Sequence, residues 1–225
     1  MKPKKRSISK SKLIAPIIVI AVLFLVIGIG TSYFRKSLYT VMKVPDFQLT
    51  DQNGQKISNK DMLGKVYLVE FFYSHCPTIC PVMNSNMRYI MTEINRPDFG
   101  IVSISIDPTH DTPEVLKNHA RMIGTTSQNW HFVSGDRDYI GNLADQFDIY
   151  VGDKEDQSES LNHSGMIALV DKDGNLRCRF DENSMPVLYY SGLNYDDPEG
   201  TKTSLRGKYH PDREKLIEDI KKLLQ

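Results

Sequence analysis

Two cysteines four residues apart, Cys76 and Cys80, are the side chains of this sequence best placed to do chemistry. Residues at this spacing lie on the same face of a helical turn, with Cβ atoms about 5–6 Å apart. Pro81 belongs in the first turn of a helix, because deeper in the helix a proline removes a hydrogen bond. We therefore expect Cys76 in a loop and Cys80 at a helix start, where the helix dipole lowers the pKa of a thiol.

The chemistry open to such a pair is metal binding or disulfide exchange, since a thiolate does both. Thiolates are soft ligands that select Cu(I) or Zn(II). A structural zinc site takes four protein ligands, and the sequence has no second cysteine pair at a suitable spacing. Two thiolates and one imidazole form a three-coordinate site that Cu(I) accepts. Two buried, inert cysteines are the alternative, against which the helix start and the flanking Pro77 and Pro81 argue.

The predicted elements place the pair at the edge of a sheet. Val66–Tyr73 is an almost continuous apolar run, typical of a strand buried on both faces, and the cysteines follow it at once. Strands then alternate with helices, which predicts an α/β fold with a largely parallel central sheet. In such sheets functional residues lie beyond the carboxyl ends of the strands. The other predicted elements are a hairpin at 46–57, a helix with apolar positions from Ile79 to Ile94, a strand at 101–106, a helix at 113–123, a strand at 130–133, a helix around 140–147, a hairpin at 166–180 and a C-terminal helix around 216–224.

Four segments carry a family resemblance. They are Asp46-Phe47 with its hairpin, Phe71–Pro81, Ser105–Pro113, and Leu161–Ser164 followed by 167–174. Over residues 44–180 and the last helix, the chain resembles the Sco/SenC family of copper proteins, which help to assemble the dinuclear copper centre of cytochrome c oxidase. The resemblance implies a thioredoxin-like fold, with a central sheet flanked by helices and an N-terminal hairpin. It also implies that Cys76, Cys80 and His163 bind copper, as Cu(I) and as a candidate Cu(II) form.

The position of His163 agrees with this role. It follows the polar stretch 152–160 and precedes the strand that begins at Met166. Related thioredoxin-type folds carry a cis-proline before that strand, whereas residues 155–165 contain no proline. On position alone a surface histidine is the usual interpretation, and only the family pattern favours a ligand. The family often has an acid before this histidine, but Asn162 supplies no charge, so we expect copper affinity or reduction potential to differ.

Other residues near the cysteines have weaker cases. Glu70 stands six residues before Cys76, as the buried acid of thioredoxins does, and burial would raise its pKa. The alternative is a side chain that reaches water at the sheet margin. We expect His75 to lie near the metal or to be exposed, and His110 to lie on another rim of the site.

Four further side chains have competing explanations. Asp107 and Asp111 are candidates for meeting a partner, although helix capping explains Asp111 nearly as well. Met83 and Met87 have the spacing of core residues rather than of copper ligands. The remaining histidines, His119, His131 and His210, are assigned no role. Cys178 is expected to be a buried, inert thiol.

The N-terminus predicts a membrane anchor. Residues 1–12 form a basic tail, and 13–34 form an apolar stretch long enough to span a bilayer. An uncleaved signal anchor is the preferred interpretation, and a cleaved signal peptide is the alternative. The charge bias places the tail in the cytoplasm and the rest outside, and a bacterial inner membrane is the expected location. A tether at 35–45 and a domain at 46–225, with a polar insertion at 181–209, complete the chain. Six of the 28 basic residues lie in the tail, so the remainder is acidic and nucleic acid is an unsuitable partner.

The sequence thus predicts a membrane-anchored copper metallochaperone. Its expected partners are a copper-receiving oxidase subunit, a copper donor and a thiol reductant. The alternative is a membrane-tethered thiol–disulfide oxidoreductase in which Cys76 and Cys80 form a redox-active pair. Both activities are compatible, since a disulfide between the cysteines blocks copper binding and reduction restores it.

Overall fold

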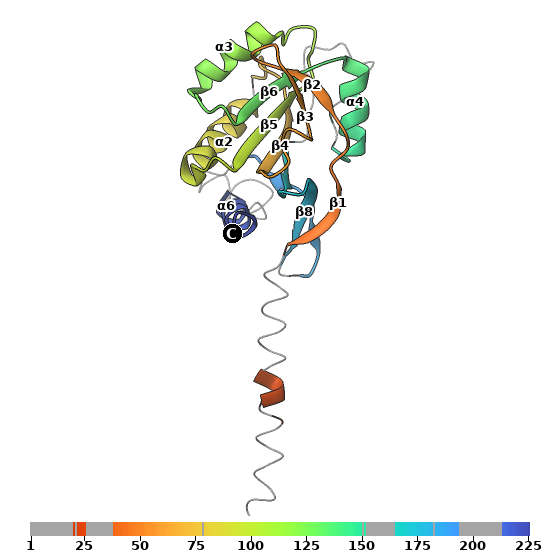
Figure 1. Ribbon diagram of the computed structural model, residues 1–225, viewed down its shortest axis with the longest axis vertical. Helices are drawn as coiled ribbons and strands as arrows, with labels where there is room; N and C mark the ends of the chain where they lie inside the picture. The colour runs from red at the N-terminus through yellow and green to blue at the C-terminus, as the bar shows by residue number, and fades with distance from the viewer. Residues whose placement is uncertain are drawn as a thin grey trace, which may run out of the picture. The chain divides into compact units, whose positions relative to one another are not determined.

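A computed structural model of the chain describes residues 20, 22–25, 38–77, 79–149, 151, 165–181, 183–193 and 213–225 (Figure 1). The chain divides into two compact units, Met1–Leu38 and Tyr39–Gln225. Among the residues that the structure describes, no helix is both long enough and apolar enough to cross a membrane. Most of the predicted anchor at 13–34 lies outside the described residues, and the anchor therefore stays a prediction.

The described part of the second unit is built around one ten-stranded sheet. Its strands are β1 (Tyr39–Lys43), β2 (Gln48–Asp51), β3 (Lys56–Ser58), β4 (Val66–Phe72), β5 (Phe99–Ser105), β6 (Trp130–Ser134), β7 (Met166–Val170), β8 (Asn175–Phe180), β9 (Pro186–Val187) and β10 (Tyr190–Ser191). They lie in the order β1-β8-β7-β4-β5-β6-β2-β3, with β10 beside β7 and β9 beside β8. The central strands β4, β5 and β6 are parallel, and β7 is antiparallel to β4. The sheet is therefore mixed, with the predicted parallel strands at its centre.

The helices cover both faces of the sheet. They are α2 (Cys80–Ile94), α3 (Pro113–Ile123), α4 (Arg137–Gln146) and α6 (Arg213–Leu223). Figure 1 shows α2, α3 and α6 on one side of the sheet and α4 on the other. The ring of Phe72 stacks on His119 of α3, whereas its neighbour Phe71 packs against Phe147 at the end of α4. Because successive residues of a strand point to opposite faces, β4 is buried on both sides and has to be apolar throughout.

Helix α3 begins and ends where the sequence predicts. The Thr112 side chain accepts a hydrogen bond from the Val115 amide, and Pro113 occupies the first turn, where its missing amide hydrogen costs nothing. Gly124 ends the helix with a φ of 78°, a left-handed conformation that glycine adopts without strain. The predicted hairpins are also present, as β2–β3 and β7–β8.

The structure departs from the sequence analysis at two places. Tyr39–Lys43, inside the predicted tether at 35–45, forms β1, and the prediction was wrong there because every β1 residue is exposed or half-buried and no alternating pattern marks the strand. The predicted polar insertion at 181–209 contributes β9 and β10, while 194–212 lies outside the described residues. Strand β10 pairs with Met166 and Ile167 at the start of β7, whereas β8 pairs with Leu169 and Val170 at its end.

A buried polar cluster fixes α6 to the sheet. Asp219 is fully buried and accepts hydrogen bonds from Tyr190 at 2.7 Å, from Lys222 at 2.8 Å and from Arg179 at 3.1 Å. A buried carboxylate is stable only when it is paired and hydrogen-bonded in this way. The predicted C-terminal helix thus packs on the sheet through an acidic residue as well as through its apolar face.

Candidate metal centre

The two cysteines lie together at the carboxyl end of β4, as expected. Cys80 is the first residue of α2 and Cys76 lies in the loop before it, with 2% and 7% of their surfaces exposed. The Cys80 sulfur is hydrogen-bonded to the Cys76 thiol and to the backbone of Tyr73. No disulfide joins them or Cys178, and all three cysteines belong to the described residues. The site therefore presents two adjacent, reduced thiols.

The predicted effect of the helix start on Cys80 is wrong. Its pKa is raised, chiefly because burial disfavours the thiolate, and the neighbouring Cys76 and Glu70 act in the same direction. The helix has no side-chain cap and no acidic residue in its first turn, but any dipole effect is smaller than the loss of hydration. Cys80 is thus a protonated thiol at rest, and a metal ion that binds it has to displace the proton.

Tyr73 lies against the pair and was not singled out by the sequence. Burial raises the pKa of Tyr73 to about 12, and a hydrogen bond with the Cys76 side chain contributes to the shift. Its carbonyl oxygen accepts a hydrogen bond from the Cys76 amide at 3.3 Å, which closes the loop. Its position at the end of an apolar strand, three residues before Cys76, is the signal that could have identified it.

Asp111 holds the loop before the cysteines and is the second residue whose role the sequence missed. It is fully buried, and its Oδ2 accepts hydrogen bonds from the Ser74 amide at 3.0 Å and from the Ser105 hydroxyl at 2.5 Å. The Ser74 hydroxyl donates to its Oδ1. Thr112 caps α3 instead, so the capping explanation for Asp111 was wrong. Asp111 joins the loop after β4 to the loop after β5.

The other rim residues are exposed. His75 has 68% of its side chain exposed, and its Nδ1 lies 2.8 Å from Ser74 Oγ and 3.9 Å from Asp111 Oδ1. His110 is 69% exposed and its Nδ1 lies 2.8 Å from Asp107 Oδ2. Among the described residues, the contacts of these two imidazoles are with Ser74, Asp107 and Asp111 and not with the cysteine sulfurs. Both histidines are therefore available to a partner molecule that approaches the loop.

His163 and Asn162 lie outside the described residues, but the chain next to them is placed. A Cβ added at Gly165 would lie 3.6 Å from Cδ1 of Ile79, the residue before Cys80. The Gly165 carbonyl oxygen accepts a hydrogen bond from the Gly192 amide at 2.8 Å, and Asn86 of α2 donates to the Gly192 carbonyl at 3.0 Å. The chain two residues after His163 is thus fixed against the helix that begins with Cys80.

Glu70 is buried on the same face of the sheet as Phe72, and the alternative of a side chain that reaches water was wrong. It is fully inaccessible, and the Ser103 hydroxyl donates to its Oε1 at 2.6 Å while the Trp130 indole donates to Ser103 Oγ at 2.9 Å. Its Oε2 has no hydrogen-bond partner among the described residues. Burial raises the pKa of Glu70 to about 7, and the Ser103 hydrogen bond only partly opposes this. Glu70 is therefore neutral below that pH.

Replacing Glu70 with Gln should remove a pH dependence of stability. Between pH 4.5 and 7 the unfolded chain loses the Glu70 proton while the folded protein keeps it, so wild-type stability falls as pH rises through this window. The variant stays neutral, and its free energy of unfolding should rise relative to wild type by up to roughly 3 kcal/mol over that range, with no further gain above pH 7. Denaturant unfolding at several pH values measures this difference. A difference between Glu70→Gln and wild type that does not change with pH would contradict a neutral Glu70.

Another buried pair lies one helical turn from Cys80. Asn84 Nδ2 lies 3.2 Å from Nε2 of His119, and both side chains are buried. Burial lowers the pKa of His119, which lies between the rings of Phe72 and Phe132. No role was expected for this histidine, and the structure places it as a neutral packing residue between α3 and α2.

The thiols of Cys76 and Cys80 suit a soft metal cation, but they supply only two of its ligands. Within the described residues, no three His, Cys, Asp or Glu side chains form a group that could hold a metal ion. Two adjacent thiols are nevertheless the donor type that Cu(I) selects. Met83 and Met87 are buried in the core, as predicted, and Cys178 is buried in β8 with a raised pKa.

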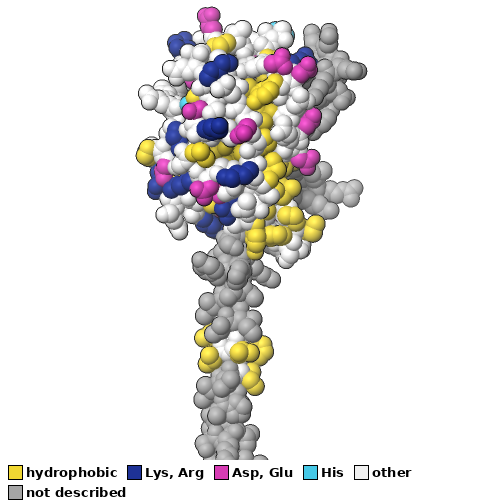
Figure 2. Space-filling model, turned by 45° about the vertical axis from the view of Figure 1, so that its right-hand side comes forward, with side chains coloured by type: hydrophobic (Ala, Val, Ile, Leu, Met, Phe, Trp, Pro, Cys, Tyr) yellow, Lys and Arg dark blue, Asp and Glu magenta, His cyan; other side chains and the backbone are white. Residues whose placement is uncertain are grey.

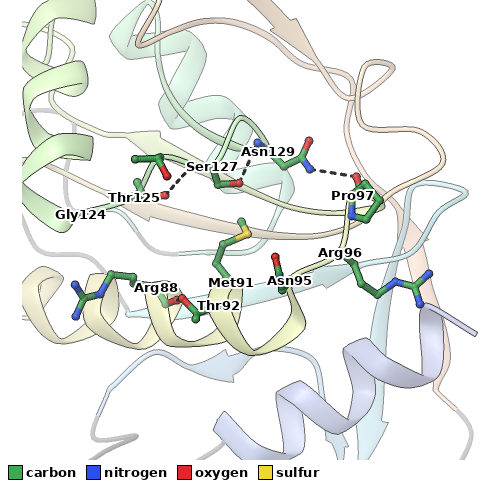
Figure 3. Close-up of a pocket in the computed structure, with 11 residues that line it drawn as sticks. Arg88, Met91, Thr92, Asn95, Arg96, Pro97, Gly124, Thr125, Ser127 and Asn129 are labelled. Atoms are coloured by element: carbon green, nitrogen blue, oxygen red, sulfur yellow. Dashed lines mark hydrogen bonds between the residues drawn. The ribbon is translucent and has the colours of Figure 1, made fainter.

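A cavity of about 510 Å³ lies near the opposite end of α2 (Figure 3). Its lining consists of Arg88, Met91, Thr92, Asn95, Arg96, Pro97, Gly124, Thr125, Thr126, Ser127 and Asn129. Asn129 donates to the Pro97 carbonyl at 3.1 Å, which joins the segments that precede β5 and β6. The lining contains no thiol, imidazole or carboxylate, so this cavity offers no copper ligand and is separate from the cysteine site.

This fold and site define a class of protein. It is a thioredoxin-like domain with two neighbouring thiols at the carboxyl end of a central strand. The SCO1/SenC family model matches residues 36–193. A SCO2-like protein of Rickettsia felis is 32% identical over 194 residues, which cover 75% of this chain and 91% of that protein. The chain belongs to the SCO1/SenC family.

Solved structures agree with the fold. ScoI of Bradyrhizobium japonicum with copper bound is 25% identical, with a TM-score of 0.54 over 81% of this chain and 99% of that one. BsSco, described as having a disulfide switch and as a member of the Sco family of cytochrome c oxidase assembly proteins, is 24% identical. Its TM-score is 0.62 over 84% of this chain and 96% of that one, which shows the shared fold.

Proposed function

We propose that this protein is a membrane-anchored copper metallochaperone that binds copper through Cys76, Cys80 and His163. The copper is cargo destined for the copper centre of a cytochrome c oxidase subunit. The observation that carries the proposal is the contact between two buried thiols, Cys76 and Cys80. Gly165, the described residue closest in sequence to His163, lies against Ile79, the residue before Cys80. The copper-bound relative and the oxidase-assembly relative support the identity of the metal and of its destination.

Two parts of the chain contribute to the proposed site. Asp111 and Tyr73 fix the cysteine loop through hydrogen bonds to Ser74 and to the Cys76 amide. His163 would complete the site from the segment before β7. Copper binding releases the thiol protons, because the thiolate is the form that bonds the metal. With only three ligands, copper remains open to a donor atom of an acceptor protein.

A thiol–disulfide oxidoreductase is the second candidate. The contact between the two sulfurs favours it, and so does the buried Glu70, which acts electrostatically on Cys80. Two features disfavour the oxidoreductase. Three residues separate the cysteines instead of two, and no peptide bond among the described residues is cis. In this reaction the two thiols give two electrons and two protons to a disulfide of a partner. The partner would be a cysteine pair of the copper-receiving protein.

Location follows from the N-terminal sequence. Residues 13–34 would cross a bacterial inner membrane with the basic tail in the cytoplasm, and the copper-binding domain would lie in the extracytoplasmic space. A copper donor and a thiol reductant on that side would load the site and keep the cysteines reduced. The polar insertion at 181–209 remains a candidate surface for a partner.

Anaerobic titration of the reduced chain with Cu(I) against a competing chelator tests the proposed function. We expect one tightly bound equivalent, and none after oxidation of Cys76 and Cys80 to a disulfide. Mass spectrometry of the alkylated chain reports the oxidation state of the cysteines in the same samples. Weak binding by the fully reduced chain would contradict the metallochaperone and favour the oxidoreductase. Binding that survives oxidation would place copper at other residues.

A further inference from the structure

Apolar side chains are exposed at the corner of the second unit where β1 begins and β8 ends. Tyr39 and Val41 of β1 are 39% and 38% exposed, Phe180 at the end of β8 is 39% exposed, and Met185 in the following turn is 62% exposed. The rings of Tyr39 and Phe180 meet edge to face, with centroids 4.8 Å apart. Figure 2 shows hydrophobic side chains gathered on this side of the molecule. We call Tyr39, Val41, Phe180 and Met185 the apolar corner.

Backbone hydrogen bonds hold the residues of the apolar corner in place. Tyr39 is paired with Cys178, and Phe180 with Pro186. The Asp181 carboxylate accepts a hydrogen bond from the Met185 amide at 2.8 Å, and the Asp181 amide donates to the Met185 carbonyl at 2.9 Å. The Asp181 carboxylate is thus engaged with its own turn. Met185 is left as the most exposed member.

The length of the chain before β1 indicates what covers this corner. Only residues 35–38 separate the end of the apolar stretch 13–34 from Tyr39, and four residues span at most about 14 Å. A domain on so short a tether keeps the start of β1 close to the headgroups of any bilayer that 13–34 crosses. Two of the four residues, Arg35 and Lys36, are basic and suit anionic headgroups. Tyrosine and tryptophan side chains are enriched at the membrane–water interface, the depth at which the headgroups lie.

We propose that the apolar corner docks onto the interface of the lipid bilayer beside the anchor. The inference rests on the membrane anchor of the proposed function. Docking gives the domain a second point of attachment and so limits its rotation on the tether. The cysteine loop then meets a membrane-bound copper acceptor in a restricted set of orientations. Exposed apolar patches on soluble domains commonly mark such contacts.

Tryptophan fluorescence of the full chain in vesicles tests the proposal. Met185→Trp places a reporter in the corner, and Met122→Trp is the matched control, because Met122 is 76% exposed on α3, which packs beside β6. Strand β6 lies four strands from β8 in the sheet. The single native tryptophan, Trp130, is fully buried, and wild type gives its background. The vesicles contain phosphatidylcholine and phosphatidylglycerol, with or without bromine on the acyl chains.

The expected result for Met185→Trp is a blue shift of the reporter emission and loss of most of its intensity in brominated vesicles, with neither change for the control variant. Flotation of the same vesicles reports separately whether the anchor holds the chain, and Cu(I) titration reports the copper site. A chain that floats without quenching of the corner reporter overturns docking and leaves the anchor standing. A chain that does not float overturns both. A blue shift without quenching, together with a cross-linked dimer, would assign the corner to a second copy and overturn the lipid proposal.

Discussion

Cys76→Ala and Cys80→Ala are each expected to abolish tight Cu(I) binding, and His163→Ala to weaken it by at least about tenfold. Each cysteine supplies one of the two thiols that lie in contact at the site. The described residues contain no group of three His, Cys, Asp or Glu side chains that could hold the metal in their place. Loss of a residue that only orients a metal ligand already costs about 10–100-fold in affinity. Loss of a ligand itself should cost at least as much. The measurement is competition with a chelator under anaerobic conditions.

Two control variants separate the ligand set from general damage. Cys178→Ala removes a buried thiol of β8, and His110→Ala removes an exposed imidazole paired with Asp107. Both variants should bind Cu(I) as wild type does. Unchanged affinity in His163→Ala would remove His163 from the site and leave a two-coordinate dithiol. Disulfide exchange measured on the same variant tests the second candidate function, because that reaction needs the cysteines but not the imidazole.

Asp111→Ala is expected to destabilise the protein by about 3 kcal/mol and to weaken Cu(I) binding, although Asp111 is no ligand. The substitution leaves the half-buried Ser74 amide and the buried Ser105 hydroxyl without their acceptor. Hydrogen bonds to a charged acceptor are among the stronger ones in proteins. The loop that carries Cys76 then loses its connection to the loop after β5. Denaturant unfolding measures the stability change, and hydrogen exchange at the Ser74 amide measures the loss of order.

Asp107→Asn is the matched control for Asp111. Asp107 lies in the same loop but pairs with an exposed histidine, and exposed pairs contribute less than about 1 kcal/mol. Ser105→Ala removes one of the three hydrogen bonds to the Asp111 carboxylate and offers a milder variant that should fold. Stability of Asp111→Ala equal to that of the control would show that the loop is held by other contacts. Normal Cu(I) affinity in a folded variant with a disordered loop would separate copper binding from loop order.

Much of the fold followed from local patterns. The unbroken apolar run at 66–73 predicted β4, because a strand buried on both faces contains no polar side. Thr112, Pro113 and Gly124 predicted both ends of α3, since capping and helix termination depend on adjacent residues. Strand β1 was missed because it is an exposed edge strand, held by pairing with β8 rather than by burial of its own side chains.

The sequence by itself determined which side chains can do chemistry, namely two cysteines at helical spacing after an apolar strand and an acid six residues before the first of them. It also indicated the family to which the chain belongs. Only the tertiary structure decided how these groups behave. The pKa of Cys80 is raised, not lowered, because hydration is lost from every side while a helix dipole acts only locally. Asp111 fixes the cysteine loop and the segment after His163 lies against α2 through contacts between residues far apart in the chain, which no local pattern records.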